Sequence, residues 1–319
     1  MPLITAPVIV PEEPTTPPVE LPEVGYATVT YIDPAGGRWP MTDLSPGSQW
    51  YTLADGVSGL GAAPYELISD PHPRGGARLR HVQPQPRSIV WPVLVKGADH
   101  MEFTRNWRSI GRAFTRTLRE GPGLLEVARP DGGVRQIAVY YADGWDGRGQ
   151  AATGITWDSA VVTLWCEDPY WVDAQPVTVH REQGTDVDFL VPYPSVSSSQ
   201  VLGATTVDNP GDVDVWPVWT VTGPASAIEF TREDTGDSFT LTMADTVHGP
   251  LLAGETVTIS TDPPRVRSDT GENLTPGLDW PAAVLWSLPP GPTPVTFQLD
   301  GAAAGSAVDL VFHPRYETA

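Results

Sequence analysis

Residues 87–97 read RSIVWPVLVKG, and this stretch together with the segment after it decides the fold prediction for the first half of the chain. Its apolar residues stand at both odd and even positions, which is typical of a β-strand covered on both faces, although Pro92 limits the ladder hydrogen bonds. A helical period follows in residues 99–119, where apolar residues recur every three or four positions: Phe103, Trp107, Ile110, Phe114 and Leu118. Gly121-Pro122 is a stop signal, so we expect one helix whose apolar stripe packs on a sheet.

The rest of the first half is predicted to form strands and turns. Residues 124–129 and 134–141 flank a Pro-Asp-Gly-Gly turn sequence and predict a hairpin. Residues 77–82 alternate between a mildly apolar face (Ala77, Leu79, His81) and a basic face (Arg78, Arg80, Val82). Alternation in residues 159–166 places Cys166 on the apolar face, so the single thiol is expected in the core. The glycines at positions 56, 59 and 61 are interpreted as a flexible loop.

After about residue 175 the helical period ends, and short strands recur between Pro- and Gly-rich turns, which is typical of a β-sandwich. The expected strands cover residues 186–191, 201–207, 215–222, 238–243, 256–259, 295–299 and 307–312. Residues 1–23 hold seven prolines and are expected to form an extended arm. We therefore expect a mainly β chain in three parts: the arm (1–23), a β-sandwich-like domain with one α-helix (24–175) and a C-terminal β-sandwich domain (176–319).

The composition agrees with this expectation. The 319 residues include 35 Pro and 31 Gly, so turns are frequent and long helices are not. A single cysteine excludes an intramolecular disulfide framework and a cysteine-cluster zinc site. The longest apolar stretch, residues 88–95, is far shorter than the roughly 18 residues that a membrane span needs. A soluble protein with no membrane partner is therefore expected.

The net charge of −20 argues against sequence-independent binding of nucleic acid over most of the surface. The charge is unevenly distributed, because residues 71–119 hold ten basic and two acidic side chains, whereas the other 270 residues hold nine basic and 37 acidic ones. This basic segment is either a solvated face or a surface that meets the acidic surface of another copy of the chain in a head-to-tail contact.

The expected helix carries part of this positive charge. Its second face presents five arginines at spacings of three and four: Arg105, Arg108, Arg112, Arg116 and Arg119. Like charges on one face repel each other unless they are solvated or paired. The first four are therefore candidates for an interface with carboxylates of a neighbouring subunit, and water with counterions is the alternative.

The sequence shows no pattern of a catalytic or metal-binding site. It lacks the H-E-x-x-H, P-loop, G-x-S-x-G and EF-hand patterns, and its six histidines are scattered, so no enzyme, cofactor or metal site is expected. Trp216 and Trp219 share a strand and would point to opposite faces. Val215, Trp219 and Val221 look like the core side, which leaves Trp216 as a candidate for contact with a partner or with carbohydrate, if it does not simply pack.

Several motifs in order along the chain resemble the distal tail protein (Dit) family of long-tailed, non-contractile bacteriophages. In the first half they are residues 87–97, the helix with Trp107 and Arg108, residues 121–127, the Pro130-Asp131-Gly132 turn and Asp168-Pro169-Tyr170-Trp171. In the second half they are residues 209–217 (NPGDVDVWP), 253–257 (AGETV), 286–291 (WSLPPG) and 312–316 (FHPRY). The resemblance covers about residues 25–319 and excludes the proline-rich arm.

The resemblance implies a structural virion protein of the phage tail tip. In this family a ring, usually of six copies, joins the tail tube to the hub or tip, and DNA passes through the lumen. The implied partners are further copies of the chain (a homo-hexamer), the tail tube protein, the hub protein and DNA in transit, and the implied place of assembly is the cytoplasm of the bacterial host. The C-terminal sandwich would be of the kind found in galectins and carbohydrate-binding modules.

An alternative function of a different class is an adhesion module that recognises host cell-wall glycan through the C-terminal sandwich. A cell-wall hydrolase would instead need a cleft with two facing carboxylates, and the adjacent acids Glu233 and Asp234 in a turn-like sequence do not indicate one. Binding of glycan by the second half separates the adhesion module from a purely structural component.

Overall fold

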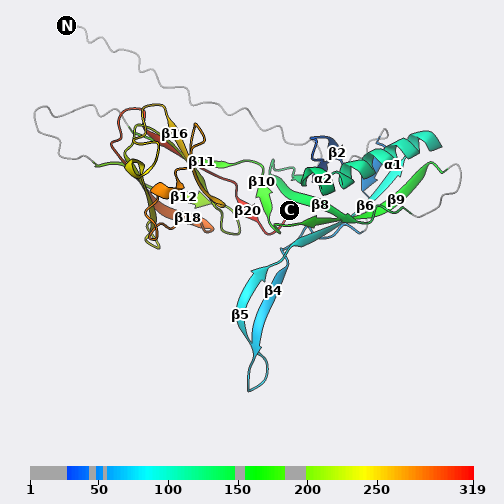
Figure 1. The fold of residues 1–319 in the computed structure, drawn as a ribbon. Helices are drawn as coiled ribbons and strands as arrows, with labels where there is room; N and C mark the ends of the chain where they lie inside the picture. The colour runs from blue at the N-terminus through cyan, green and yellow to red at the C-terminus, as the bar shows by residue number, and fades with distance from the viewer. Residues whose placement is uncertain (1–26, 43–47, 53–55, 148–154, 184–198) are drawn as a thin grey trace, which may run out of the picture.

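A computed structural model describes residues 27–42, 48–52, 56–147, 155–183 and 199–319. The chain is mainly β, as expected, and it folds into two units with a two-stranded hairpin that projects away from both (Figure 1). The expected arm and the expected strand at residues 186–191 lie outside the described residues.

The first unit is built on one antiparallel sheet with the strand order β2-β1-β7-β8-β9-β6-β3. Its strands are β1 (Thr28–Ile32), β2 (Arg38–Pro40), β3 (Trp50–Thr52), β6 (Arg87–Lys96), β7 (Gly123–Ala128), β8 (Val134–Asp143) and β9 (Trp157–Cys166). The predicted hairpin of β7 and β8 is confirmed, with Gly123 opposite Val139. The alternation in β9 is confirmed too, because its even-numbered residues from Asp158 to Cys166 are buried.

The expected helix covers this sheet but is divided in two (Figure 1). Helix α1 (His100–Thr115) begins after Asp99, whose side chain accepts a hydrogen bond from the amide of Glu102, and α2 (Thr117–Glu120) is one turn long. Phe103, Ile110 and Phe114 are buried against the sheet as predicted. The prediction for Leu118 is wrong, since α1 ends at Thr115 and this side chain is 59% exposed.

Strand β6 lies at the centre of the first core, but only one of its two faces is fully buried. Ile89, Trp91, Val93 and Val95 are almost fully buried. On the other face Ser88 is exposed, and the side chains of residues 90 and 94 are half-buried, so the expected cover on both faces is incomplete. Pro92 lies on this second face and is buried.

The second unit is the expected β-sandwich. One sheet has the order β11-β19-β13-β16-β17 and the other β12-β18-β14-β15. The strands are β11 (Val177–Glu182), β12 (Ser199–Asn209), β13 (Val218–Thr222), β14 (Ala227–Arg232), β15 (Asp237–Thr242), β16 (Thr256–Thr261), β17 (Pro264–Ser268), β18 (Gly291–Asp300) and β19 (Ala307–Phe312). Two short 3-10 turns, η1 (Met243–Asp245) and η2 (Thr275–Gly277), lie between strands. The sequence analysis missed β11, β14 and β17.

An aromatic cluster fills the space between these two sheets. Trp219 of β13 is fully buried and stacks on Phe230, with 4.4 Å between the ring centroids. Trp286, Phe239 and Phe297 meet the indole edge-on at 4.9 to 6.1 Å. Such rings bury a large apolar area, so the second unit has a hydrophobic core of its own.

The end of the chain returns from the second unit to the first. Strand β20 (Arg315–Tyr316) pairs with β10 (Trp171–Asp173), which itself pairs with β8. Ala319 is buried in the first core, and Figure 1 shows the C-terminus beside β10. The two units are therefore joined by two chain segments rather than by one linker.

Candidate interaction sites

The projecting hairpin consists of β4 (Tyr65–Pro71) and β5 (Ala77–Pro84), and nearly all of its residues are exposed. Leu67 lies opposite Val82 and Ser69 opposite Leu79, while the register shifts by one residue between Ile68 and Ser69. This bulge changes the predicted faces of β5, because Val82 joins Leu79 on the apolar side and His81 lies on the side of Arg78.

A buried arginine holds the base of the hairpin to the body. Arg87, which follows β5 after two residues, is 1% exposed. Its Nη1 donates to the carbonyl oxygens of Gly59 (2.8 Å) and Gly61 (2.6 Å), and its Nη2 donates to the carbonyl of Glu317 (2.7 Å). The glycine-rich segment expected to be a flexible loop is thus held against β6, and a Cβ at Gly59 would lie 2.3 Å from the Ser88 carbonyl oxygen.

The carboxylate of Glu317 reinforces the same base. It accepts hydrogen bonds from the amide of Ala63 at 2.9 Å and from the hydroxyl of Tyr65, which also lies 3.0 Å from the hydroxyl of Tyr170. Burial and these two hydrogen-bonded neighbours raise the pKa of Tyr65 well above its usual value. Contacts across more than 250 residues therefore tie the hairpin to the end of the chain.

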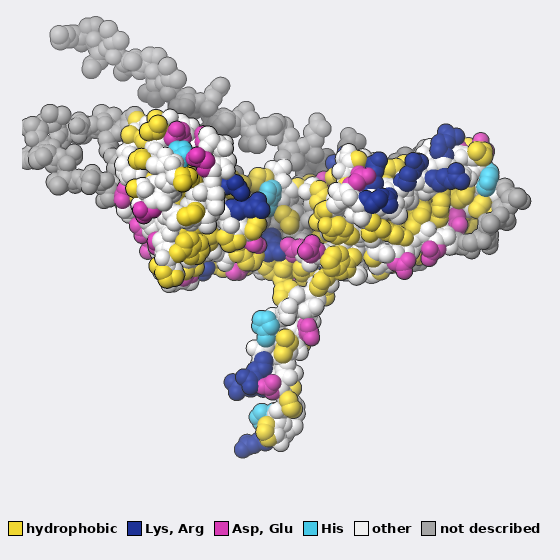
Figure 2. Space-filling model, in the orientation of Figure 1, with side chains coloured by type: hydrophobic (Ala, Val, Ile, Leu, Met, Phe, Trp, Pro, Cys, Tyr) yellow, Lys and Arg dark blue, Asp and Glu magenta, His cyan; other side chains and the backbone are white. Residues whose placement is uncertain are grey.

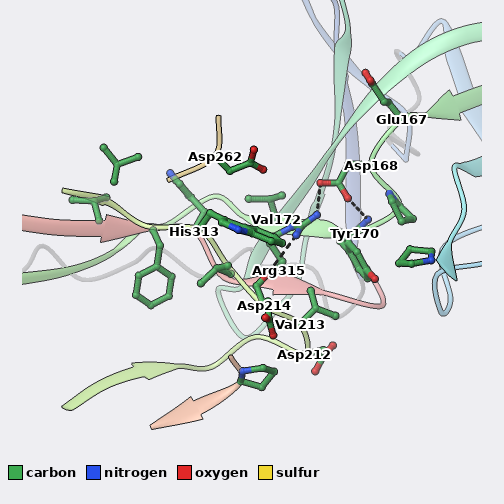
Figure 3. A pocket seen from close by; sticks show the side chains of 18 residues that line it. Glu167, Asp168, Tyr170, Val172, Asp212, Val213, Asp214, Asp262, His313 and Arg315 are labelled. Atoms are coloured by element: carbon green, nitrogen blue, oxygen red, sulfur yellow. Dashed lines mark hydrogen bonds and ion pairs between the residues drawn. The ribbon is translucent and has the colours of Figure 1, made fainter. Parts of the chain in front are cut away.

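A groove of about 1070 Å³ lies at the junction of the two units (Figure 3). Arg315 reaches into it and donates to Asp168 at 2.5 Å. Further acidic side chains line the groove: Glu167, Asp212, Asp214 and Asp262. The groove therefore has a negative charge that one arginine offsets only in part.

Trp216, the predicted contact residue, lies on the wall of this groove. It is 41% exposed, whereas Trp219 is fully buried; the prediction that the two share a strand is wrong, because β13 begins at Val218. The guanidinium of Arg315 lies 5.5 Å from the centroid of the Trp216 ring, a cation–π distance.

Three of the four predicted interface arginines lie along α1 and Arg116 directly follows it, in the region where Figure 2 shows basic side chains gathered. Arg105, Arg108 and Arg112 are exposed. Arg116 differs, because it is half-buried and lies 3.6 Å from Asp33 and 3.5 Å from Glu120. Three of the four guanidinium groups therefore project from the surface, and the fourth has carboxylates of its own chain beside it.

Asp33 is buried at the turn between β1 and β2. Burial opposes its ionisation, but the Trp39 indole and the amides of Gly37 and Ala35 donate hydrogen bonds to it, and Arg116 lies beside it. Together these groups hold the pKa of the carboxyl below its usual value. The carboxylate thereby connects the end of α1 to the first strands.

The outward face of β9 is apolar and exposed, as is one side of the β4–β5 hairpin. Trp157, Val161 and Trp165 are 50%, 54% and 39% exposed, although the opposite face of the same strand is buried. Trp165 has the Tyr140 ring of β8 beside it, 6.1 Å between centroids.

The described residues lack two other kinds of site. No group of three or more His, Cys, Asp or Glu side chains is placed to hold a metal ion there. Within the same residues no helix is long and apolar enough to cross a membrane.

Solved structures of phage tail proteins share this architecture. The chain aligns with the SPP1 Dit (gp 19.1) protein, described as a paradigm of the hub adsorption apparatus in phages that infect Gram-positive bacteria, with a TM-score of 0.62 and 15% identity over 91% of this chain and 98% of the other. The chain has the Dit fold. Chains of the phage P2 baseplate in its activated conformation, with Ca and with Sr, align with TM-scores of 0.52 and 0.51 at 10% and 11% identity. These alignments cover 92% and 90% of this chain.

The alignments with the Dit fold include both units, because at least nine-tenths of this chain is covered in each case. The resemblance predicted from the sequence motifs is thus confirmed for the fold. At the level of sequence, no family model matches, and neither does any curated protein.

Proposed function

We propose that this chain is a structural component of a phage tail, a distal ring between the tail tube and the hub, and not an enzyme. The observation that carries the proposal is the Dit fold over nearly the full length of both this chain and SPP1 Dit. Its copies would form a closed ring of six through the first unit, and the second unit would project outward. The ring would be part of the virion and would assemble in the cytoplasm of the host.

Three features of the surface support self-association. The hairpin of β4 and β5 extends beyond the body, three arginines of α1 project outward, and the rest of the chain is strongly acidic. Opposite charges on different parts of one chain favour head-to-tail contacts, which close into a ring when the rotation between copies allows it.

The negative charge also fits the passage of DNA. A lumen lined with arginine would retain phosphate groups, whereas an acidic lumen would let the polymer slide. In this proposal the tail tube protein and the hub protein bind at the two ends of the ring, and DNA is in contact with it only in transit.

Electron microscopy tests the proposal directly. Images of the purified chain, and of tails labelled with an antibody against it, are expected to show a sixfold ring and a label at the tip of the tail. A monomeric mass at high concentration together with particles that carry neither ring nor label would contradict it.

The groove beside Trp216 favours glycan binding as a second candidate function. An exposed indole near carboxylates and an arginine is a common composition for a sugar site, since the ring face packs on the sugar, the carboxylates accept hydrogen bonds from its hydroxyl groups and the guanidinium donates hydrogen bonds to its oxygens. Trp216→Ala is expected to abolish the retention of the full chain on host cell walls under this alternative. If the native chain and Trp216→Ala are retained equally, or if neither is retained, glycan binding by this groove is rejected.

A further inference from the structure

One face of the hairpin is apolar and uncovered. Tyr65, Leu67, Leu79 and Val82 lie on this face and are 40%, 66%, 54% and 39% exposed. No described residue of the chain covers it, because the hairpin projects from the body (Figures 1 and 2). A two-stranded hairpin is marginally stable in water unless its apolar face packs against something else.

The other face of the hairpin is mixed, with Glu66, Asp70, Arg78 and His81 beside the exposed Ile68. Arg78 lies opposite Asp70, Arg80 stands at the bulge and contacts the same carboxylate, and Arg74 is at the tip. The hairpin thus holds three arginines against two acidic residues, while the chain as a whole has a net charge of −20. An acidic surface on another copy of this chain would therefore attract the positively charged hairpin more strongly than a neutral or basic partner would.

The outward face of β9 has the properties of a matching surface. Its exposed Val161 and Trp165 present a flat apolar area on a sheet, the kind of surface on which another sheet packs face to face. Three exposed carboxylates flank this strand: Asp143, the last residue of β8 and opposite Thr163, Asp146 in the loop after β8, and Glu167 after the end of β9. The surface thus combines an apolar centre with an acidic border.

We infer that the apolar face of the β4–β5 hairpin of one copy packs on the outward face of β9 of the next copy. Arg78 lies on the opposite face of the hairpin and Arg80 at its bulge, so the positive charge of the hairpin would act on the acidic border of that strand from the edge of the contact and not from within it. Because the two surfaces lie on different elements, the contact is head-to-tail and can repeat around a ring. The inference rests on the proposed self-association and adds which two elements meet.

Cross-linking between two variants, each with one added cysteine, tests this contact. Leu79→Cys in one tagged copy and Val161→Cys in a differently tagged copy are mixed and treated with a short bismaleimide. The native thiol does not interfere, since Cys166 is fully buried and burial raises its pKa to about 12. Gln83→Cys is the matched control, because Gln83 lies on the opposite face of the same strand.

We expect a cross-linked pair from Leu79→Cys with Val161→Cys at a yield at least tenfold above that from Gln83→Cys with Val161→Cys. Equal yields, or assembled rings without any cross-link, would overturn the inference and leave the proposed ring standing. Strictly monomeric protein up to its solubility limit would overturn both. A hairpin cysteine that cross-links only to another tail protein in particles would also overturn the inference.

A second variant separates the contact from the folding of the monomer. Leu67→Ser with Leu79→Ser is expected to weaken self-association at least tenfold without a change in the thermal midpoint of the monomer, since both side chains are exposed. Glu66→Ser with Gln83→Ser, on the opposite face, is expected to leave association unchanged. Unchanged association of the leucine variant would contradict the proposed contact.

Discussion

Single buried polar residues join segments of this chain that are distant in sequence. Arg87 connects the glycine-rich loop, β6 and the last residues through three carbonyl oxygens. Asp33 connects the β1–β2 turn to the end of α1. A buried charge is costly unless hydrogen bonds compensate it, so the loss of either side chain is expected to affect more than one segment.

For Asp33→Asn we expect a loss of about 1–3 kcal/mol in the free energy of unfolding at pH 7, because donors arranged for a carboxylate lose their charged acceptor. The pKa of Asp33 is lowered on folding, so its stabilising effect is present above about pH 4, the value in the unfolded chain, and disappears as the pH falls through the lowered pKa. The two proteins should therefore converge in stability in acid.

Denaturant unfolding at pH 7 and near pH 3 measures this difference. Asp131→Asn is a suitable control, since Asp131 makes a comparable turn hydrogen bond to Gly133 at an exposed position. A stability gap for Asp33→Asn that is equally large at both pH values would show that the charge is not the cause.

At the scale of the element, helix α1 depends on the packing of its inner face. Gly111 lies in the middle of the helix, where alanine is normally more stable by about 1 kcal/mol. Here a Cβ would lie 2.4 Å from Nε1 of Trp145, and that indole is held between Trp107 and Phe114 at 4.4 and 5.7 Å between centroids.

Gly111→Ala is therefore expected to destabilise the chain by about 1–3 kcal/mol, the usual cost of overpacking, instead of stabilising it. Thermal unfolding of the variant measures the sign. Ser109→Ala is the matched control at a half-buried position of the same helix. A higher midpoint for Gly111→Ala would mean that Trp145 moves aside freely.

The outer face of α1 leads to a prediction about assembly. Single exposed ion pairs contribute only about 0–1 kcal/mol, but several pairs repeated around a ring add up. We expect Arg108→Glu with Arg112→Glu to weaken the ring and to alter its response to salt. Arg105 belongs to the same exposed set, whereas Arg116 has Asp33 beside it within its own chain and is left intact.

Light scattering that measures ring assembly as a function of salt concentration tests this expectation. Arg265→Glu with Arg267→Glu is the matched double reversal, on exposed positions of β17 in the second unit. Rings with unchanged stability and unchanged salt response in the α1 variant would show that its arginines are only solvated.

At the scale of the whole molecule, we propose that the second unit is an independent domain. All buried members of its core cluster lie between residues 207 and 312, and the half-buried residues that pack on it lie between 177 and 285. The seven residues after Phe312 contact the first unit through β20 and Ala319, and their hydrogen bonds to Asp212 and Asp214 of the second unit lie outside its core cluster. The fold of the sandwich therefore does not require them.

A fragment of residues 176–312 is expected to unfold cooperatively, and the fragment 176–319 is expected to have nearly the same stability. Circular dichroism during chemical denaturation compares the two. Loss of cooperative unfolding in both fragments would contradict the boundary near residue 175, and its loss in the shorter one alone would assign a role in the sandwich to the last seven residues.

Local patterns in the sequence determined much of this molecule. The helical period before Gly121, the β7–β8 turn, the burial of Cys166 and the burial of Trp219 with Val221 were all predictable. Each depends only on side-chain spacing within one element, since the period of a strand or a helix decides which residues share a face.

Only the tertiary structure decided the contacts between distant residues. The bulge at Arg80 reverses the faces of β5, and no short-range pattern announces it. The bond from Arg87 to Glu317 joins residues 230 positions apart, and the pairing of β20 with β10 brings the end of the chain to the first unit. Such contacts form because a buried charge or an unpaired strand edge must find a hydrogen-bonding partner when the chain folds. The periodicity of the sequence does not say which distant residue that partner is.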